Sequence, residues 1–263
     1  MAFAALGTRS GFLPIGTTGP GARNAQPSRK PEKHVLIALL NDATGVGRTT
    51  IAAHLAGWLA QRDVRVAAID TDPHGALTRW LRCAAPQVPV RGFTTANQLH
   101  ALARRLAGEH DVVVADGPSG RKLETATLAA VCDLCVLPIG PTQQDAWAAA
   151  HTARVVNLVR RHPKRCGFPL AFAVANRVGA DDDMAAIQHN AARRLRLPVT
   201  RCAVHAQPVI AEARGRGRLA GQLGPRGEQA AHEFSALFES MLEVSSGEQR
   251  ALSADACVAD WAK

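Results

Sequence analysis

The stretch Asn41-Asp42-Ala43-Thr44-Gly45-Val46-Gly47-Arg48-Thr49-Thr50 follows the apolar run of residues 34–40 and precedes a helical pattern. This order of strand, glycine turn and helix is typical of a phosphate-binding loop. Two glycines let the backbone approach an anion closely, and the amides and dipole at the start of the helix attract the anion. The sequence therefore predicts a nucleotide site formed by Gly45, Val46, Gly47, Arg48, Thr49 and Thr50.

Two positions of this stretch depart from the usual GxxxxGK[ST] pattern. Arg48 replaces the usual Lys, and Asp42 replaces the first Gly. A guanidinium is planar, larger and more weakly hydrated than an ammonium, so the exchange is not conservative at a tight phosphate site. Losing a well-placed cation at the transferring phosphoryl group slows the reaction on the order of 10³-fold. We expect binding to persist and turnover to suffer, with the Asp42 carboxylate unfavourable beside phosphates unless Arg48 or solvent offsets it.

Apolar runs and helical patterns alternate along the rest of the chain. The strand-like runs lie at residues 34–40, 64–69, 111–115, 134–139, 170–175 and 199–204. The helical patterns lie from residue 51 onward and at residues 96–106, 123–131, 143–161, 182–195, 209–213 and 228–244. Strands that are apolar throughout and separated by helices predict an α/β fold, with a mostly parallel twisted sheet and helices on both faces, of the P-loop NTPase type.

The length of 263 residues and the apolar content of 47% suit one globular domain with tails. Residues 1–33 are rich in Gly, Pro, Thr and Ala and carry five basic residues against one acid, which predicts a disordered basic extension. We expect a P-loop ATPase domain over residues 34–245 and a flexible tail over residues 246–263.

Polar side chains end several predicted strands, and ligands of parallel sheets bind at the carboxyl ends of the strands. Thr49 directly follows Arg48 and has the position to bind Mg²⁺. Asp116 closes a strand with the Walker B character of a carboxylate that holds a metal-bound water. Asp70 and Asp72 are one residue apart, which predicts Asp70 near the metal and Asp72 near the terminal phosphate.

Each of these features also has a structural explanation, because Asp-Pro and Asp-Gly-Pro are common turns and threonines often begin helices. A dinucleotide site is a second alternative, since Gly45-Val46-Gly47 resembles the start of GxGxxG and Asp70 lies where a ribose-binding acid belongs. Thr50 occupies the third glycine position, and this alternative leaves Asp72 and Asp116 unexplained. A nucleoside triphosphate is therefore favoured.

The order of these motifs resembles that of the ParA-type partition ATPases, the deviant Walker A class that also contains the MinD-like proteins. The resemblance covers roughly residues 35–244 and is most specific at residues 45–50, 69–75, 116–119 and 132–141. It implies binding of ATP with Mg²⁺, an ATP-dependent homodimer, non-specific binding of double-stranded DNA by that dimer, and slow hydrolysis stimulated by a partner protein.

The resemblance also assigns roles to positions. It implies that Thr49 binds magnesium and that Asp116 has the Walker B role. It implies catalytic roles for Arg48, at the phosphate lysine, and for Asp72, at the hydrolytic switch. Asn176 resembles the family's adenine-side segment and is assigned to nucleotide binding.

The family's signature lysine, which reaches the phosphates of the partner subunit, falls at Ala43. The resemblance implies a weak ATPase that partitions a plasmid or chromosome, or positions another cargo, on nucleoid DNA in the cytoplasm. The expected partners are a second copy, DNA and a centromere- or cargo-binding protein. A non-hydrolysing nucleotide-binding scaffold of the same fold is the alternative that Ala43 and Arg48 suggest.

The net charge of +9 is concentrated in residues 193–226, where eight arginines face one acid, Glu212. Most of the excess would then lie on one face, which favours sequence-tolerant, salt-dependent contacts with DNA phosphates over a merely solvated basic surface. The predicted DNA-binding residues are Arg193, Arg194, Arg196, Arg214, Arg216 and Arg218.

A membrane partner is not expected, because no apolar run approaches the ~20 residues that cross a bilayer. The helical pattern at residues 228–244 carries four Glu and no Lys or Arg, so anionic lipid would repel it. Its apolar residues predict a core-packing stripe: Phe234, Leu237, Phe238, Met241 and Leu242. Six scattered cysteines fit a reducing cytoplasm, and Cys132 and Cys135 read as core residues rather than zinc ligands.

Overall fold

The computed structural model describes residues 34–92, 95–162 and 168–241. The predicted extension at residues 1–33 and the predicted tail at residues 246–263 lie outside these ranges. The strands are β1 (Val35–Leu39), β2 (Val66–Asp70), β3 (Val90–Gly92), β4 (Val112–Asp116), β5 (Leu134–Ile139), β6 (Leu170–Val178) and β7 (Val204–His205). The helices are α1 (Arg48–Ala60), α2 (Ala76–Ala84), α3 (Ala96–Glu109), α4 (Lys122–Val131), α5 (Gln143–Arg160), α6 (Met184–Leu195), α7 (Pro208–Gly215) and the 3₁₀ segment η2 (Ala220–Gly227).

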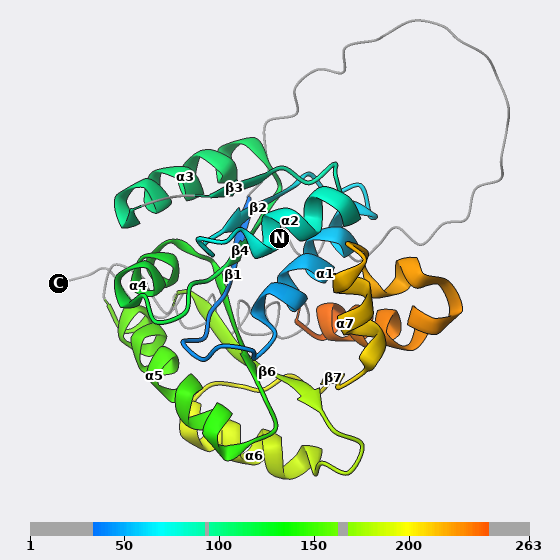
Figure 1. Cartoon of the computed structure of the whole chain (residues 1–263). Helices are drawn as coiled ribbons and strands as arrows, with labels where there is room; N and C mark the ends of the chain where they lie inside the picture. Colours follow the sequence, from blue (N-terminus) through cyan, green and yellow to red (C-terminus); the bar gives the residue numbers. More distant parts are fainter. Residues whose placement is uncertain (1–33, 93–94, 163–167, 242–263) are drawn as a thin grey trace, which may run out of the picture.

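The seven strands form one sheet in the order β3-β2-β4-β1-β5-β6-β7, and every neighbouring pair is parallel (Figure 1). The register pairs Asp116 at the end of β4 with both Leu39 of β1 and Asp70 of β2. The carboxyl ends of these central strands therefore lie at one edge, where the chain leaves β1 for the glycine loop.

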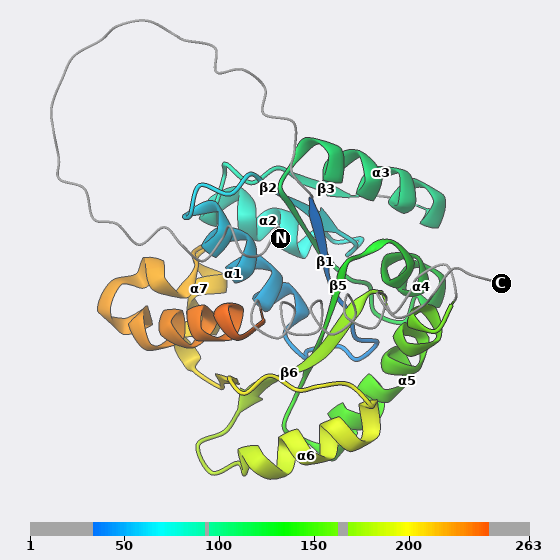
Figure 2. The same cartoon turned by 180° about the vertical axis from the view of Figure 1, so that it is seen from behind.

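Alternate residues of each strand enter two separate cores. Ile37 and Val114 belong to a core that also takes residues of α1, α2 and the helical residues 228–241, whereas Ala38 and Val113 belong to a core shared with α3 to α6. Figures 1 and 2 show α1, α2 and α7 on one side of the sheet and α4, α5 and α6 on the other. The predicted α/β fold with helices on both faces is confirmed.

The helical residues 228–241 pack as the apolar stripe predicts. Phe234, Leu237, Phe238 and Met241 are buried in the first core, and Leu242 lies outside the described residues. Among the described helices, none combines the length and apolarity needed to cross a bilayer. The cysteines Cys132 and Cys135 are fully buried in the second core, as expected of core residues.

Candidate nucleotide site

The glycine loop presents a row of free backbone donors. Among the described residues, no acceptor is bonded to the seven N–H groups of residues 44–50, which connect β1 to the first turn of α1. Gly45 and Gly47 have positive φ angles of 75° and 92°, conformations that favour glycine. Successive unpaired amides at a helix start, with no acid in the first turn of α1, form a site for an anion.

The end of β6 supports this loop through two consecutive side chains. The Asn176 side-chain amide donates to the Val46 carbonyl at 2.7 Å, and the Arg177 guanidinium donates to the Gly45 carbonyl at 2.8 Å. The contact with Asn176 is so close that a Cβ on Gly47 would lie 2.0 Å from its amide nitrogen. Arg177 was absent from the sequence-based prediction, because nothing in the local sequence indicates that it folds back onto the loop.

The predicted metal-site residues Thr49 and Asp116 lie together. The Thr49 hydroxyl donates to Asp116 Oδ2 at 2.6 Å, joining the start of α1 to the end of β4. Burial raises the pKa of Asp116 to about 7, while the Thr49 hydrogen bond and the Arg48 charge act in the opposite direction. A hydroxyl and a carboxylate beside the free amides fit a magnesium ion that also takes phosphate oxygens. Within the described residues, no cluster of three or more His, Cys, Asp or Glu side chains could hold a metal ion by itself.

Arg48 contacts the turn after β4. Its guanidinium donates to the carbonyls of Gly117, at 3.0 Å, and Pro118, and to the Ser119 hydroxyl. Burial lowers the pKa of Arg48, and the carboxylates of Asp116, Asp42 and Asp72 partly offset this effect. The side chain lines the nucleotide cavity and uses both terminal nitrogens of its guanidinium on these protein acceptors, so it differs from a lysine whose ammonium is free for phosphate.

The two aspartates after β2 have different surroundings. Asp70 is buried and accepts hydrogen bonds from the Thr78 N–H at 2.8 Å, the Thr78 hydroxyl at 2.7 Å and the Asp72 N–H at 3.0 Å. These donors hold Asp70 at the start of α2, and its predicted metal role stays a prediction. Asp72 lines the nucleotide cavity and accepts from the His74 N–H at 2.9 Å. Its predicted place near the terminal phosphate stays a prediction.

Asp42 contacts two residues of α5. Its Oδ2 lies 2.8 Å from Nδ1 of His151 on α5, and its backbone N–H donates to the Thr152 hydroxyl at 3.0 Å. The carboxylate therefore has a histidine of α5 as its hydrogen-bond partner, and the charge of Arg48 also interacts with it.

The loop opens into a cavity of about 540 Å³ at the carboxyl edge of the sheet. This volume lies within the range of ligand pockets, roughly 300–1,000 Å³. One wall contains residues of the predicted site, and the opposite wall is formed by the segment around α7, which the sequence did not indicate. The lining residues of that wall include His205, Gln207, Pro208, Ile210, Ala211 and Arg214.

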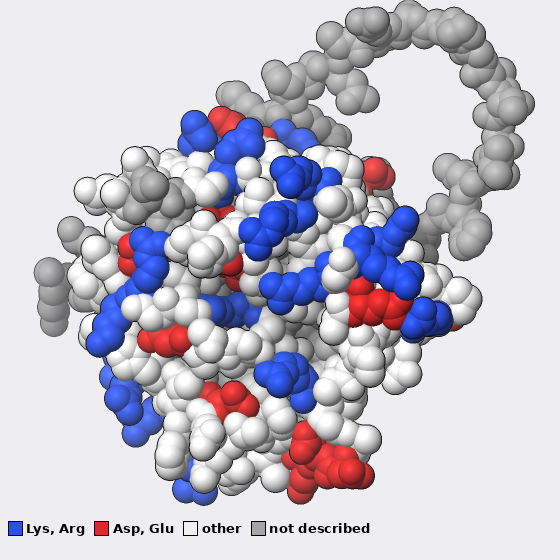
Figure 3. Space-filling view, in the orientation of Figure 1, with Lys and Arg blue, Asp and Glu red and all other residues white. Residues whose placement is uncertain are grey.

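The predicted DNA-binding arginines do not share one face. Arg193 and Arg194 lie on α6, which packs with the second core, whereas Arg214 ends α7, whose Ile210 packs on the first core. All six are exposed, but the sheet separates the two groups. Figure 3 shows basic side chains scattered among acidic ones over the visible face. The expectation of a single basic surface over residues 193–226 is therefore wrong.

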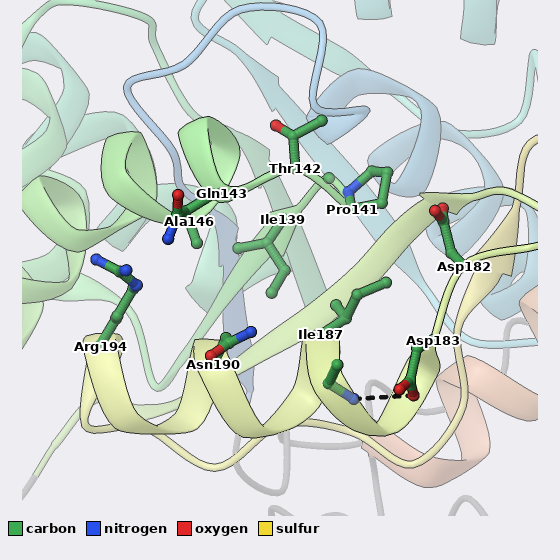
Figure 4. Close-up of a pocket in the computed structure, with 12 residues that line it drawn as sticks. Ile139, Pro141, Thr142, Gln143, Ala146, Asp182, Asp183, Ile187, Asn190 and Arg194 are labelled. Atoms are coloured by element: carbon green, nitrogen blue, oxygen red, sulfur yellow. Dashed lines mark hydrogen bonds between the residues drawn. The ribbon is translucent and has the colours of Figure 1, made fainter.

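Arg194 faces a second cavity, of about 380 Å³, between the start of α5 and α6 (Figure 4). Ile139 and Ile187 line its apolar part, and Asn190 lies beside Arg194 on α6. The guanidinium of Arg194 lies 5.6 Å from the ring centroid of the exposed Trp147. This cavity shares no lining residue with the nucleotide cavity, so Arg194 and Arg214 line different cavities.

Comparison with known proteins matches residues 37–220 to the CbiA family, described as the CobQ/CobB/MinD/ParA nucleotide binding domain. The maintenance of carboxysome distribution protein A of Halothiobacillus neapolitanus is 30% identical over 216 residues, covering 80% of this chain and 97% of that protein. The protein of the same name from Gloeobacter kilaueensis is 36% identical over 116 residues, covering 42% of this chain and 51% of that protein.

Solved structures of two related proteins have the same fold as this chain. The Cyanothece McdA(D38A)-ATP complex aligns with a TM-score of 0.64 at 16% identity, over 80% of this chain and 96% of that one. MinD of Pyrococcus horikoshii complexed with Mg-ADP aligns with a TM-score of 0.60 at 19% identity, over 76% and 94%. At these identities the likeness establishes the P-loop NTPase fold. Together with the match over residues 37–220, it means that this chain belongs to the CobQ/CobB/MinD/ParA nucleotide-binding family.

Proposed function

We propose that the chain binds ATP with Mg²⁺ in the 540 Å³ cavity and works as a ParA-like positioning protein. The observation that carries this proposal is the row of seven N–H groups of residues 44–50, which have no acceptor in the described part of the chain and lie beside the Thr49–Asp116 pair. Such a row stabilises phosphate charge without any rearrangement of the backbone. Bound Mg²⁺ would neutralise charge on the phosphate oxygens.

The position of each residue in the cavity suggests its role. Thr49 would supply a hydroxyl ligand to the metal, and Asp116 would hold a water of its outer shell. Asp72 lies on the cavity wall and orients the attacking water. Asn176 fixes the loop from the side of β6 and borders the base end of the cavity, where the α7 segment closes the site.

The cargo-positioning part of the proposal is supported by the Halothiobacillus neapolitanus relative, a protein whose name states that it maintains carboxysome distribution. As the resemblance to the ParA-type partition ATPases implies, the chain would dimerise on ATP, bind double-stranded DNA of the nucleoid, and be stimulated by a cargo-binding partner. Plasmid partition is the related possibility within the same mechanism. The extension at residues 1–33 would add a basic arm to the domain at residues 34–245.

A second candidate is a non-hydrolysing, nucleotide-binding scaffold. The observation that favours it is the engagement of Arg48 with residues 117–119, because a guanidinium held there does not reach out to a transferring phosphoryl group. Ala43 adds to this, since it cannot supply the charge that a lysine would carry across a dimer.

The two candidates are separated by reverting both positions, Ala43→Lys with Arg48→Lys, and by measuring Mg·ATP binding and turnover in parallel. The positioning ATPase predicts that the natural chain turns over ATP slowly and that the double variant gains more than about tenfold in rate, since a placed cation contributes several kcal/mol. Tight binding with undetectable turnover in both proteins would identify the scaffold.

A further inference from the structure

We infer that Arg177, acting with Asn176, positions the loop so that its amides face the polyphosphate of the ligand. Arg177 is a positioning residue in this account, and the inference rests on the proposed function of nucleotide binding. It assigns a role to a residue that the sequence pattern did not single out.

Two consecutive side chains of β6 bond two consecutive carbonyls of the loop. Asn176 bonds the carbonyl of Val46 at 2.7 Å, and Arg177 bonds the carbonyl of Gly45 at 2.8 Å. Two neighbouring carbonyls of the loop are therefore both turned toward the end of β6. We call this pair of contacts the β6 clamp.

The planarity of the peptide bond fixes the direction of the N–H groups that follow these carbonyls. In a trans peptide the carbonyl and the next N–H point in opposite directions. When the β6 clamp holds the carbonyls of Gly45 and Val46, it turns the N–H groups of Val46 and Gly47 away from β6. Both N–H groups belong to the row of donors that bonds no acceptor in the described part of the chain. The clamp thus orients in advance the donors that an anion needs.

The backbone of β6 is irregular at Arg177. Successive side chains of a strand normally point to opposite faces, so Asn176 and Arg177 would not both reach one loop. Here Arg177 has φ 59°, a left-handed conformation that is uncommon for residues with a Cβ, and the register with β7 shifts between Asn176 and Val178. Arg177 is also the one exposed residue of β6. This irregularity brings both side chains to the loop, which suits a site where strain serves a function.

The test compares two arginines with the same backbone conformation. Arg196 is exposed and left-handed, with φ 53°, but it follows α6 at the end remote from the loop. Asn tolerates left-handed backbone and is too short to repeat the Arg177 contact. The variants are therefore Arg177→Asn and, as the matched control, Arg196→Asn, with Arg177→Lys as a conservative variant that keeps a donor and a charge.

Binding of Mg·ATP and of inorganic tripolyphosphate to the full chain is measured by calorimetry, with thermal unfolding as a control for folding. We expect Arg177→Asn to weaken both ligands by the same factor, about tenfold or more, because a charged hydrogen bond that orders the loop is lost. Arg177→Lys should recover part of this loss, and Arg196→Asn should bind like the natural chain.

Three results would overturn the inference. Equal binding by Arg177→Asn and the natural chain would show that the loop keeps its shape without the clamp. A loss for ATP with none for tripolyphosphate would place Arg177 at the base instead. A natural chain that binds neither ligand would refute the proposed function as well, so the two failures are distinguishable.

Discussion

His54 lies in the first core, where its ring stacks on Phe234 with 3.9 Å between centroids and meets Trp80 edge-on at 5.6 Å. Nδ1 lies 2.8 Å from the carbonyl of Thr50, and Nε2 accepts from the N–H of Ala220 at 3.1 Å. A nitrogen that accepts carries no proton, so the ring is neutral and donates through Nδ1. Burial accordingly lowers the pKa of His54 to about 4. This residue joins α1 to η2 only in its neutral form.

This pKa predicts how stability depends on pH. The pKa of an unfolded histidine is near 6.5, so the unfolded chain takes up the proton before the folded one as the pH falls. The contribution is complete above pH 6.5 and declines toward pH 4, by about 3 kcal/mol in all. The free energy of unfolding of the natural chain, measured against His54→Gln between pH 7 and pH 4, should show this decline.

The control for this experiment is His232→Gln, which removes an exposed histidine from the helical residues 228–241. Its stability should follow that of the natural chain at every pH. If His54→Gln also follows the natural chain in parallel, His54 does not titrate as the buried geometry requires.

Some contacts of the site could be predicted from the sequence and others could not. Thr49 and Asp116 were expected together because both lie beside strand ends of one parallel sheet, and the structure brings them to 2.6 Å. Arg177 and the acceptors of Arg48 could not be predicted, since they depend on a left-handed turn after Asn176 and on the path of residues 117–119. The hydrogen bonds of Asp70 could not be predicted either, because its partner Thr78 lies on a helix that the sequence pattern did not reveal.

At the scale of elements, the long buried strands were the most predictable. β5 was expected at the residues where it lies, because an uninterrupted apolar run is typical of a strand that is buried on both faces inside a sheet. β3 was missed, since it has three residues at the edge and little burial. β6 extends beyond its apolar run to Val178, where tertiary pairing with β7 rather than hydrophobicity continues the strand.

The helix α2 was also missed, although its buried residues Leu77, Trp80, Leu81 and Ala84 have helical spacing. Its packing yields a prediction. Leu81 is fully buried in the first core, so Leu81→Ala should cost about 2–5 kcal/mol of unfolding free energy. Leu158 on α5 is 74% exposed, and Leu158→Ala should stay within about 0.5 kcal/mol of the natural chain. Chemical denaturation of both variants measures the difference, and similar losses would contradict the assigned packing of α2.

At the scale of the whole molecule, the two arginine groups belong to helices that pack on opposite faces of the sheet. The group of Arg214, Arg216 and Arg218 is the better candidate for nucleotide-dependent DNA binding, because Arg214 lines the nucleotide cavity. Its charge is moderated by Glu212, which lies 2.9 Å from Arg216 and also contacts Arg226. In the group on and after α6, Arg194 lines the second cavity and not the nucleotide cavity.

This division predicts unequal effects on DNA binding. Changing Arg214, Arg216 and Arg218 together to Gln should weaken binding to arbitrary double-stranded DNA with Mg·ATP and lower the salt slope by about 2 to 3, since each phosphate contact contributes about 0.9. The same change at Arg193, Arg194 and Arg196 serves as the control of equal charge and should have little effect. Equal losses in the two triple variants would contradict a single DNA-binding face.

The central claim is that this chain binds Mg·ATP through the glycine loop despite Arg48, and calorimetric titration of the full chain with Mg·ATP tests it most directly. Gly47→Ala provides the negative control, because its Cβ would collide with Asn176 at a φ of 92°. Gly120 has a φ of 65°, but no atom of the described residues lies within 4 Å of a Cβ added there. Gly120→Ala therefore has the same unfavourable left-handed backbone as Gly47→Ala, without the collision. The account predicts saturable binding by the natural chain and by Gly120→Ala, and its loss in Gly47→Ala. Absence of saturable binding by the natural chain, or unchanged binding by Gly47→Ala, would contradict it.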